Sequence, residues 1–329
     1  MDFSITKILD RYLDMESYGT SLIVKEYCHF PKYLPLPCHI EHGWTPMSTP
    51  LSSDLRIASY KKMMLVFNQR RKNIWLKASN IPVFVIGAPF VLYRQMRKIK
   101  QNPNAKGTIA FPSHSTLFIE SQYDINTYCR QLAKLPPKYH PIDVCLFHLD
   151  IKKGKDKIYK KYGFKVVSAG SKIRGSLDFV RNFYSIICQY KFATSNEIGS
   201  YILYAVEMGL PFFLLGGKTK AVNKNLKDPN IGSVVTINSY KYGLTVHKLF
   251  NTGPVDKISS SQYKFVINEL NIGKTIKPNI LKQNLFQNTG LRYWLILAPA
   301  FWFFFCLVNL FHIILPENIT YKIFIKLYK

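Results

Sequence analysis

Short apolar segments alternate with amphipathic ones along much of this chain, and this alternation constrains the fold more than any other feature. In the first hundred residues or so, apolar runs at 37–43, 63–69 and 82–89 end in turn or polar residues. The segment RRKNIWLKASN, between the last two runs, has the pattern of a helix. The order strand, helix, strand favours parallel strands joined by crossover helices, so we expect an α/β fold.

The alternation becomes more regular in the second part of the chain. Strands are expected within GTIAFPSHS, IDVCLFHLD, FKVVSAG, KFATSN and LPFFLLGG, with helices between most of them. This pattern predicts a doubly wound sheet, in which ligands bind beyond the carboxyl ends of the strands, where the strand order reverses. The loops most relevant to function are therefore PSHST, HLDIKKG, SAGSK and TSNEIGS.

A basic segment at 94–107 ends in Asn, Pro and Gly and is our candidate linker between two lobes. We place the boundary near Asn102, which gives two Rossmann-like lobes at 1–102 and 103–290. Within the second lobe, residues 218–290 are polar and rich in Lys and Asn, and we expect peripheral strands and connections there.

The segment YWLILAPAFWFFFCLVNLFHIIL at 293–315 contains no Asp, Glu, Lys or Arg and is long enough to span a bilayer. Pro299, Asn309 and His312 interrupt it, and its many aromatic residues are also typical of an interfacial or re-entrant anchor. A buried core helix is the remaining alternative, and the length argues against it. We expect 291–329 to be a helical, membrane-associating tail.

The charge, the cysteine content and the N-terminal residues indicate which partners and which compartment to expect. Lys and Arg number 45 against 19 Asp and Glu, a net charge of +26, which favours an anionic partner such as nucleic acid, acidic lipid or a phosphorylated substrate. The 6 cysteines are scattered without a C-x-x-C pair, and no histidine cluster has zinc-ligand spacing. The N-terminal residues lack the apolar run of a secretory signal. We therefore expect free thiols, no metal site and a cytosolic catalytic body.

The loop Glu41-His42-Gly43 follows a predicted strand of the first lobe. Glycine permits close approach of the backbone, and histidine accepts a proton near neutral pH. The combination suits a general base, although a turn glycine beside an incidental histidine explains the same dipeptide.

Two polar loops of the second lobe are candidates for binding phosphate. The loop after the first strand there combines three hydroxyls with an imidazole, and the loop at 194–200 precedes a predicted helix. Hydroxyls, backbone N–H groups at a helix start and a cationic imidazole are the donors that a diphosphate needs. Ordinary Ser/Thr helix caps explain the hydroxyls of the first loop almost as well. The expected donor-binding residues are Ser113, His114, Ser115, Thr116, Ser168, Gly170, Thr194, Ser195, Asn196, Gly199 and Ser200.

Several motifs of other enzyme classes are absent from the sequence. There is no Walker G-x-x-x-x-G-K-[ST], no G-x-G-x-x-G after a strand, no D-x-D typical of metal-dependent nucleotide-sugar sites, and no G-x-S-x-G elbow. Their absence disfavours nucleotide hydrolysis, hydride transfer and serine nucleophiles. A metal-free transferase stays compatible with the sequence.

With these loops the sequence resembles bacterial glycosyltransferases of the GT-B architecture, two facing Rossmann-like lobes with the donor nucleotide in the cleft. More narrowly, it is similar to the polysialyltransferase-like and CDP-glycerol glycerophosphotransferase-like enzymes of capsule, teichoic acid and lipopolysaccharide biosynthesis. The resemblance covers 37–217 at the level of pattern. It implies an acceptor lobe at 1–102, a donor-binding lobe at 103–290, catalysis by His42 with Glu41, and a donor phosphate held at His114.

The resemblance also implies a function and a location. We expect a metal-independent, inverting glycosyltransferase that moves a sugar from a nucleotide-activated donor to a surface-polysaccharide or lipid-linked acceptor. The nucleotide sugar is a co-substrate, no cofactor is expected, and the tail holds the enzyme at the cytoplasmic face of the inner membrane. A glycerophosphate or other phospho-sugar transferase fits the same motifs. A nucleic-acid-binding protein, supported by charge alone, and a silent membrane scaffold are the alternatives from other classes.

Overall fold

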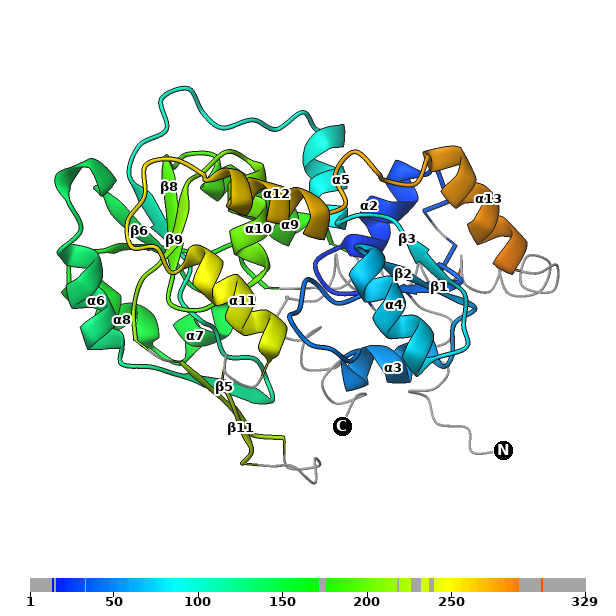
Figure 1. Cartoon of the computed structure of the whole chain (residues 1–329), viewed down its shortest axis with the longest axis horizontal. Coiled ribbons are helices and arrows are strands. Elements are labelled where there is room, and N and C mark those ends of the chain that lie inside the picture. Colours follow the sequence, from blue (N-terminus) through cyan, green and yellow to red (C-terminus); the bar gives the residue numbers. More distant parts are fainter. Residues whose placement is uncertain are drawn as a thin grey trace.

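The computed structural model of the chain contains two α/β lobes that lie side by side (Figure 1). It describes residues 14, 16–32, 34–171, 176–217, 219–225, 232–236, 240–289 and 303. Both lobes contain parallel sheets, so the expected α/β fold is confirmed. No helix within these ranges is both long and apolar enough to cross a membrane. The segment at 293–315 lies outside them, apart from Phe303.

The first lobe is built on a parallel sheet with the order β1-β2-β3. The β2 strand, MMLV, is buried along its whole length, as is typical of a parallel strand covered on both faces. The Asn68 side chain accepts a hydrogen bond from the Arg71 N–H and caps the helix that connects β2 to β3. The elements of this lobe are α2 (Thr20–Tyr27), β1 (Cys38–Ile40), α3 (Ser52–Ala58), β2 (Met63–Val66), α4 (Gln69–Ala78), β3 (Val83–Val85) and α5 (Pro89–Met96).

The second lobe contains a five-stranded parallel sheet with the order β7-β6-β4-β8-β9. The chain enters at the central strand β4, moves outward to β7, and returns to the other side of β4 through β8. The strand order therefore reverses at β4, as the alternating pattern predicted. The elements are β4 (Thr108–Ala110), α6 (Ile125–Ala133), η1 (Pro137–Tyr139), β6 (Ile142–Cys145), α7 (His148–Lys152), α8 (Lys155–Lys161), β7 (Lys165–Val167), α9 (Asp178–Ile187), β8 (Phe192–Ser195), α10 (Ser200–Glu207) and β9 (Phe212–Leu214).

A small antiparallel sheet, with the order β11-β10-β5, projects from the second lobe (Figure 1). It consists of β5 (Ile119–Gln122), β10 (Lys220–Asn223) and β11 (Val234–Val235). The inner side of this sheet contacts the main lobe, because the Ser121 side chain donates to the Ser113 hydroxyl at 2.7 Å.

The prediction of only peripheral strands and connections at 218–290 is wrong for residues 240–289, which form the helices α11 (Lys241–Phe250), α12 (Ser260–Glu269) and α13 (Pro278–Thr289). The last of these returns to the first lobe, where Leu281 and Leu285 are fully buried in the same core as Cys38 and Met63. Two leucines one helical turn apart are enough to bury α13, and such a short apolar signal is hard to detect among Lys and Asn.

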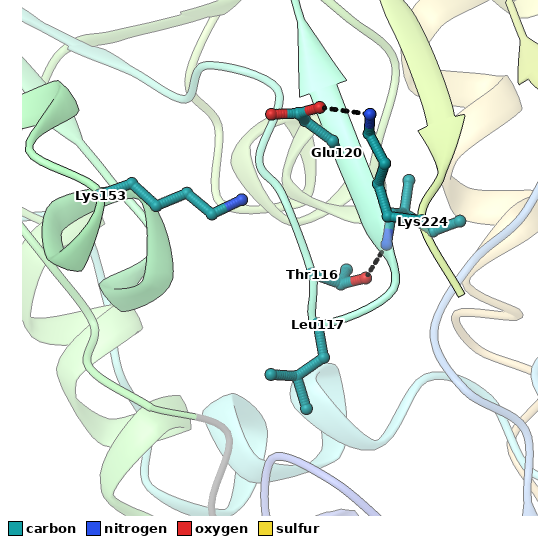
Figure 2. A pocket seen from close by; sticks show the side chains of 6 residues that line it. Thr116, Leu117, Glu120, Lys153 and Lys224 are labelled. Carbon is teal, nitrogen blue, oxygen red and sulfur yellow. Dashed lines mark hydrogen bonds and ion pairs between the residues drawn. The ribbon is translucent and has the colours of Figure 1, made fainter. Parts of the chain in front are cut away.

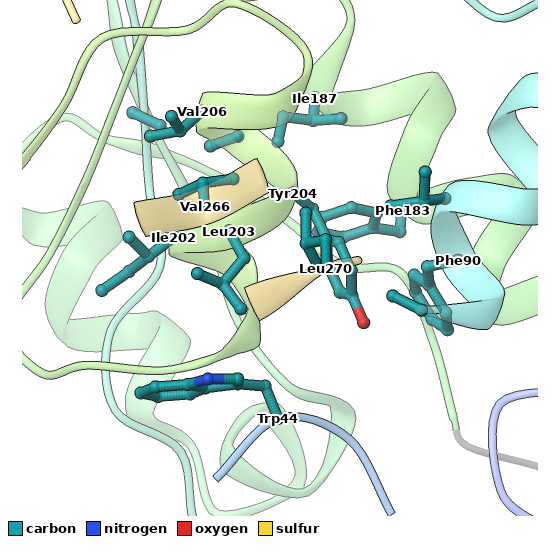
Figure 3. Close-up of a cluster of buried hydrophobic side chains, with 14 of the residues drawn as sticks. Trp44, Phe90, Phe183, Ile187, Ile202, Leu203, Tyr204, Val206, Val266 and Leu270 are labelled. Atoms are coloured by element: carbon teal, nitrogen blue, oxygen red, sulfur yellow. The ribbon is translucent and has the colours of Figure 1, made fainter. Parts of the chain in front are cut away.

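One apolar core runs through both lobes (Figure 3). Trp44 and Phe90 enter it from the first lobe, and Phe183 and Tyr204 enter it from α9 and α10 of the second. The rings of Phe90 and Tyr204 stack with their centroids 5.0 Å apart. The lobes are thus joined by continuous packing as well as by the chain itself.

Candidate functional site

Ser113 and Asn196 meet at the point where the strand order of the second lobe reverses. Ser113 follows β4 and Asn196 follows the neighbouring strand β8, and the Ser113 N–H donates to Asn196 Oδ1 at 2.7 Å. Asn196 is 9% exposed, and its Nδ2 has no acceptor among the described residues. A buried donor without an acceptor costs about 1–3 kcal/mol. Asn196 is bonded to Ser113, which lines a cavity, but does not line that cavity itself, so a ligand reaches this amide only when the loop around Asn196 moves.

A cavity of about 160 Å³ lies beside this bridge and between the lobes. The first lobe, the ends of β4 and β8, and the small antiparallel sheet all contribute walls. Ligand sites are typically about 300–1,000 Å³, so a whole nucleotide sugar needs the surrounding loops to move apart. The lining residues are Pro46, Ser113, Glu197, Ile198, Thr219, Ala221, Thr236 and Tyr240.

Glu197 supplies a carboxylate to the cavity. One carboxylate oxygen accepts from the Thr219 hydroxyl, and the other accepts from the Ile198 N–H at 2.9 Å. The Tyr201 hydroxyl donates to the Glu197 carbonyl at 2.7 Å and holds the loop in place. From the sequence, Glu197 is a possible acceptor for ribose hydroxyls that ranks behind the neighbouring loop residues, and Thr219 is not predicted. Thr219 lies two residues beyond the Gly-Gly that follows a buried strand. This position at a strand end is the sequence feature that could have identified Thr219 as a site residue.

The His-Gly loop of the first lobe contacts the start of α10 in the second. The Trp44 N–H donates to the Ser200 hydroxyl at 3.1 Å. Gly43 has a φ of +65°, and a Cβ there would lie 3.4 Å from the same hydroxyl oxygen. The loop at 41–43 and the loop at 194–200, which the sequence predicts separately as functional, therefore contact each other across the two lobes.

His42 is partly exposed beside this contact. Its ring centroid lies 5.7 Å from that of Tyr18, and its backbone N–H donates to Asp54 Oδ2 at 3.1 Å. The backbone hydrogen bond fixes the loop and the imidazole packs beside Tyr18, and His42 does not line the cavity described above.

Asp54, which accepts from the His42 N–H, is also bonded to a buried histidine. His39 is 3% exposed; its Nδ1 lies 2.9 Å from Glu16 Oε1 and its Nε2 lies 3.1 Å from Asp54 Oδ1. Burial by itself lowers the pKa of His39, but the hydrogen bonds and charges of Asp54 and Glu16 outweigh it and raise this pKa to about 9. His39 is thus an imidazolium between two carboxylates at neutral pH.

Glu41, one of the expected catalytic residues, lies inside the first lobe and is 2% exposed. Its Oε1 accepts from Arg71 Nε at 2.5 Å and from Trp75 Nε1 at 3.0 Å. Burial raises the pKa of Glu41, and the neighbouring Arg71 opposes that rise. The carboxylate therefore holds the loop from inside the first lobe and does not reach the cavity.

Several hydroxyls of the expected donor site bond protein groups instead of facing the cavity. Ser115 is fully buried; its N–H donates to Asp150 Oδ2 at 3.0 Å, and its hydroxyl accepts from Lys155 Nζ at 3.3 Å. The Thr194 hydroxyl donates to the Phe213 carbonyl at 2.8 Å inside the sheet.

Short local hydrogen bonds hold other members of the expected set. The Ser195 hydroxyl lies 2.8 Å from the Glu197 carbonyl. Thr116 Oγ1 accepts from the Ile119 N–H at 3.0 Å and closes a turn. These side chains shape the loops around the site.

The remaining expected residues lie outside the cavity lining. His114 is exposed, with its ring centroid 5.0 Å from that of Phe147. Ser168 accepts from the Gly170 N–H at 3.1 Å at the end of β7. Gly199 has extended backbone, and a Cβ there would lie 2.6 Å from the Tyr201 ring, so this position excludes larger residues.

Comparisons with known proteins leave the family open. No protein-family model matches the chain, and no curated protein matches it. Among solved structures, it is similar to the UDP-GlcNAc 2-epimerase from Neisseria meningitidis bound to UDP-GlcNAc, with 12% sequence identity and a TM-score of 0.35. The match covers 82% of this chain and 80% of that chain. A similarity this distant carries no functional argument, so the candidate site stands on its geometry.

Proposed function

We propose that the chain is a glycosyltransferase that binds a nucleotide-activated sugar between its lobes. The Ser113–Asn196 bridge carries the proposal, because it leaves a buried amide donor beside a cavity at the strand reversal. Doubly wound sheets bind ligands at this position. The facing first lobe gives the arrangement expected of a GT-B enzyme, with the acceptor on the opposite side of the crevice.

The start of α10 is the proposed site for the donor diphosphate. The first N–H groups of a helix lack acceptors within the helix, and the helix dipole favours an anion there. Asn196 Nδ2 lies in the loop before this helix and supplies a further donor. Glu197, fixed by Thr219, is positioned in the cavity lining to accept from sugar or ribose hydroxyls.

His42 is the proposed general base. It takes the proton of the acceptor hydroxyl as that oxygen attacks the anomeric carbon, and the nucleotide leaves with the bonding electron pair. The positive end of α10 stabilises the charge that develops on the leaving phosphate. Direct displacement inverts the anomeric centre, and these steps use no metal or cofactor.

The proposed acceptor is a surface-polysaccharide or lipid-linked glycan of capsule or lipopolysaccharide type. It rests on the sequence resemblance and on a net charge of +26, which favours an anionic, membrane-bound substrate. The proposed location at the cytoplasmic face of the inner membrane rests on the apolar segment at 293–315.

Product analysis tests this function. The full chain is incubated with UDP-, GDP-, CDP- and CMP-linked sugars and a lipid-glycan extract, and glycan products are followed by mass spectrometry. We expect His42→Gln to lower kcat about 10²–10⁴-fold, the usual contribution of a general base, while His247→Gln on α11 retains full activity. A comparable loss in His114→Gln alone would make His114 the catalytic histidine. Transfer of glycerophosphate, or release of no nucleotide from any donor, would contradict the proposal.

A further inference from the structure

Exposed apolar side chains lie together on the antiparallel extension of the second lobe, which we call the β-arm and define as residues 116–122, 220–224 and 234–235. We call these side chains its apolar tip. Leu117 is 50% exposed, Phe118 56% and Val234 51%. Of 8 large hydrophobic side chains exposed in the described part of the chain, the β-arm holds these three and Ile119. Single exposed apolar residues are ordinary, whereas a cluster on one short element indicates a binding surface.

Backbone hydrogen bonds hold the tip in this exposed form. The Lys224 N–H donates to the Phe118 carbonyl at 2.7 Å, and the Thr116 N–H donates to the Ile119 carbonyl at 2.7 Å. One bond closes the turn between β4 and β5, and the other fixes the turn to the residue after β10. Leu117 and Phe118 face solvent because a closed turn presents them there.

Two lysines lie beside part of the apolar tip. A pocket of about 310 Å³ is lined by Thr116, Leu117, Ile119, Glu120, Lys153 and Lys224. Lys153 points into this space from the end of α7, opposite Glu120 and Lys224 (Figure 2). Lys224 Nζ lies 3.4 Å from Glu120 Oε2, so the one carboxylate of the lining is offset by a lysine. The pocket therefore combines an apolar edge with an ammonium that can meet an external anion.

We propose that the β-arm docks on the surface of a bilayer that contains anionic phospholipid. Leucine and phenylalanine enter the boundary between headgroups and acyl chains, while the lysines extend toward lipid phosphates. The lining contains two lysines, a residue that is depleted at protein–protein interfaces and attracted to anionic lipid. The chemistry of the tip therefore favours lipid over a protein partner.

Docking in this way brings the interlobe cavity close to the headgroups. Phe118 and Ser121 are three residues apart, about 10 Å along a strand, and the Ser121 side chain bonds to Ser113 in the cavity lining. A lipid-linked acceptor would then reach the cavity from the bilayer. This consequence rests on the proposed function, whereas the docking itself does not.

Vesicle binding by the full chain tests the charge component. Phosphatidylcholine vesicles with and without phosphatidylglycerol are compared by flotation at low salt. We expect Lys153→Gln and Lys224→Gln each to weaken binding to the anionic vesicles about fivefold, the equivalent of one lysine near a charged surface. Lys77→Gln, an exposed lysine on α4, is the matched control and should bind as the wild type does. Equal effects of all three substitutions would indicate attraction by total charge and overturn the docking surface.

Depth-dependent quenching tests insertion of the tip, independently of any other segment that binds membranes. Phe118→Trp and Leu76→Trp place an indole on the β-arm and on α4 at similar exposures, 56% and 53%. With brominated phosphatidylcholine and phosphatidylglycerol, we expect Trp fluorescence to be quenched more strongly in Phe118→Trp than in Leu76→Trp. Equal quenching on bound vesicles would mean that the β-arm remains in water, and the proposal would be wrong.

Discussion

The two lobes use polar residues in and just after their strands in opposite ways. In the first lobe, Glu41 and His39 are buried and face charged partners, so each carboxylate or imidazolium serves another protein group. In the second lobe, the bridge between Ser113 and Asn196 leaves an amide donor beside a cavity. Glu41 Oε2 and Asn196 Nδ2 are both buried without a partner among the described residues, and the difference is that Asn196 is bonded to a residue that lines a cavity.

The largest effect that tests this comparison is expected at Arg71. Substitution by Met removes the partner of Glu41, whose other carboxylate oxygen already has no hydrogen-bond partner among the described residues. Breaking one side of a buried ion pair costs about 3–5 kcal/mol, so the free energy of unfolding in urea should fall by that amount. The double variant Glu41→Gln/Arg71→Met should recover much of the loss. A change below about 1 kcal/mol in the single variant would show that the pair is not part of the scaffold.

A pH series measures the charge on His39. Its folded-state pKa is about 9 against an ordinary value of 6.5, so its contribution is complete below pH 6.5 and disappears as pH rises through 9. The shift corresponds to about 3 kcal/mol in the free energy of unfolding. Urea unfolding from pH 6 to 10 should show this loss in the wild type and not in His39→Gln. Parallel curves for the two proteins would contradict an imidazolium between Glu16 and Asp54.

The smallest effect is expected at Gly43, where the lobes touch. Alanine there must adopt a φ of +65°, which costs about 1–2 kcal/mol, and its Cβ makes ordinary contact with Ser200. Gly154→Ala is the matched control, since its φ is +77° and no atom lies within 4 Å of the added Cβ. We expect similar stability losses by thermal unfolding, with transfer activity reduced in Gly43→Ala alone. Equal transfer activities of the two variants would show that the contact at Gly43 does not contribute to function.

The sequence was sufficient to predict the parallel strands, because unbroken apolar runs such as 63–66 and 212–214 require cover on both faces. It also predicted a doubly wound sheet with a reversal of strand order, but not which of the four strand-end loops lies beside the reversal. It did not predict which way each polar side chain turns. Glu41 follows β1 and Thr194 lies within β8, and their partners Arg71 and Phe213, which come from other elements, hold both side chains inside the protein.

Two further features could not be predicted from the sequence, because they depend on contacts between residues far apart along the chain. Glu197 and Thr219 approach each other from loops after different strands, so no local pattern links them. The helix α13 returns to the first lobe through only two fully buried leucines. The division at Asn102 and the membrane-associating tail at 291–329 stay predictions.

The most direct measurement of the central claim is a thermal-shift comparison of wild type and Asn196→Asp with UDP-, GDP-, CDP- and CMP-linked sugars. Aspartate keeps the acceptor for the Ser113 N–H and replaces the buried amide donor with an anionic oxygen that has no partner among the described residues, so the unliganded Tm should fall, and each ligand shift is measured from the unliganded Tm of the same protein. We expect one nucleotide class to raise the Tm of the wild type, and binding about 10–100-fold weaker, with most of that shift lost, in Asn196→Asp. An equal shift in both proteins, or no shift with any nucleotide, would contradict a donor site at the Ser113–Asn196 bridge.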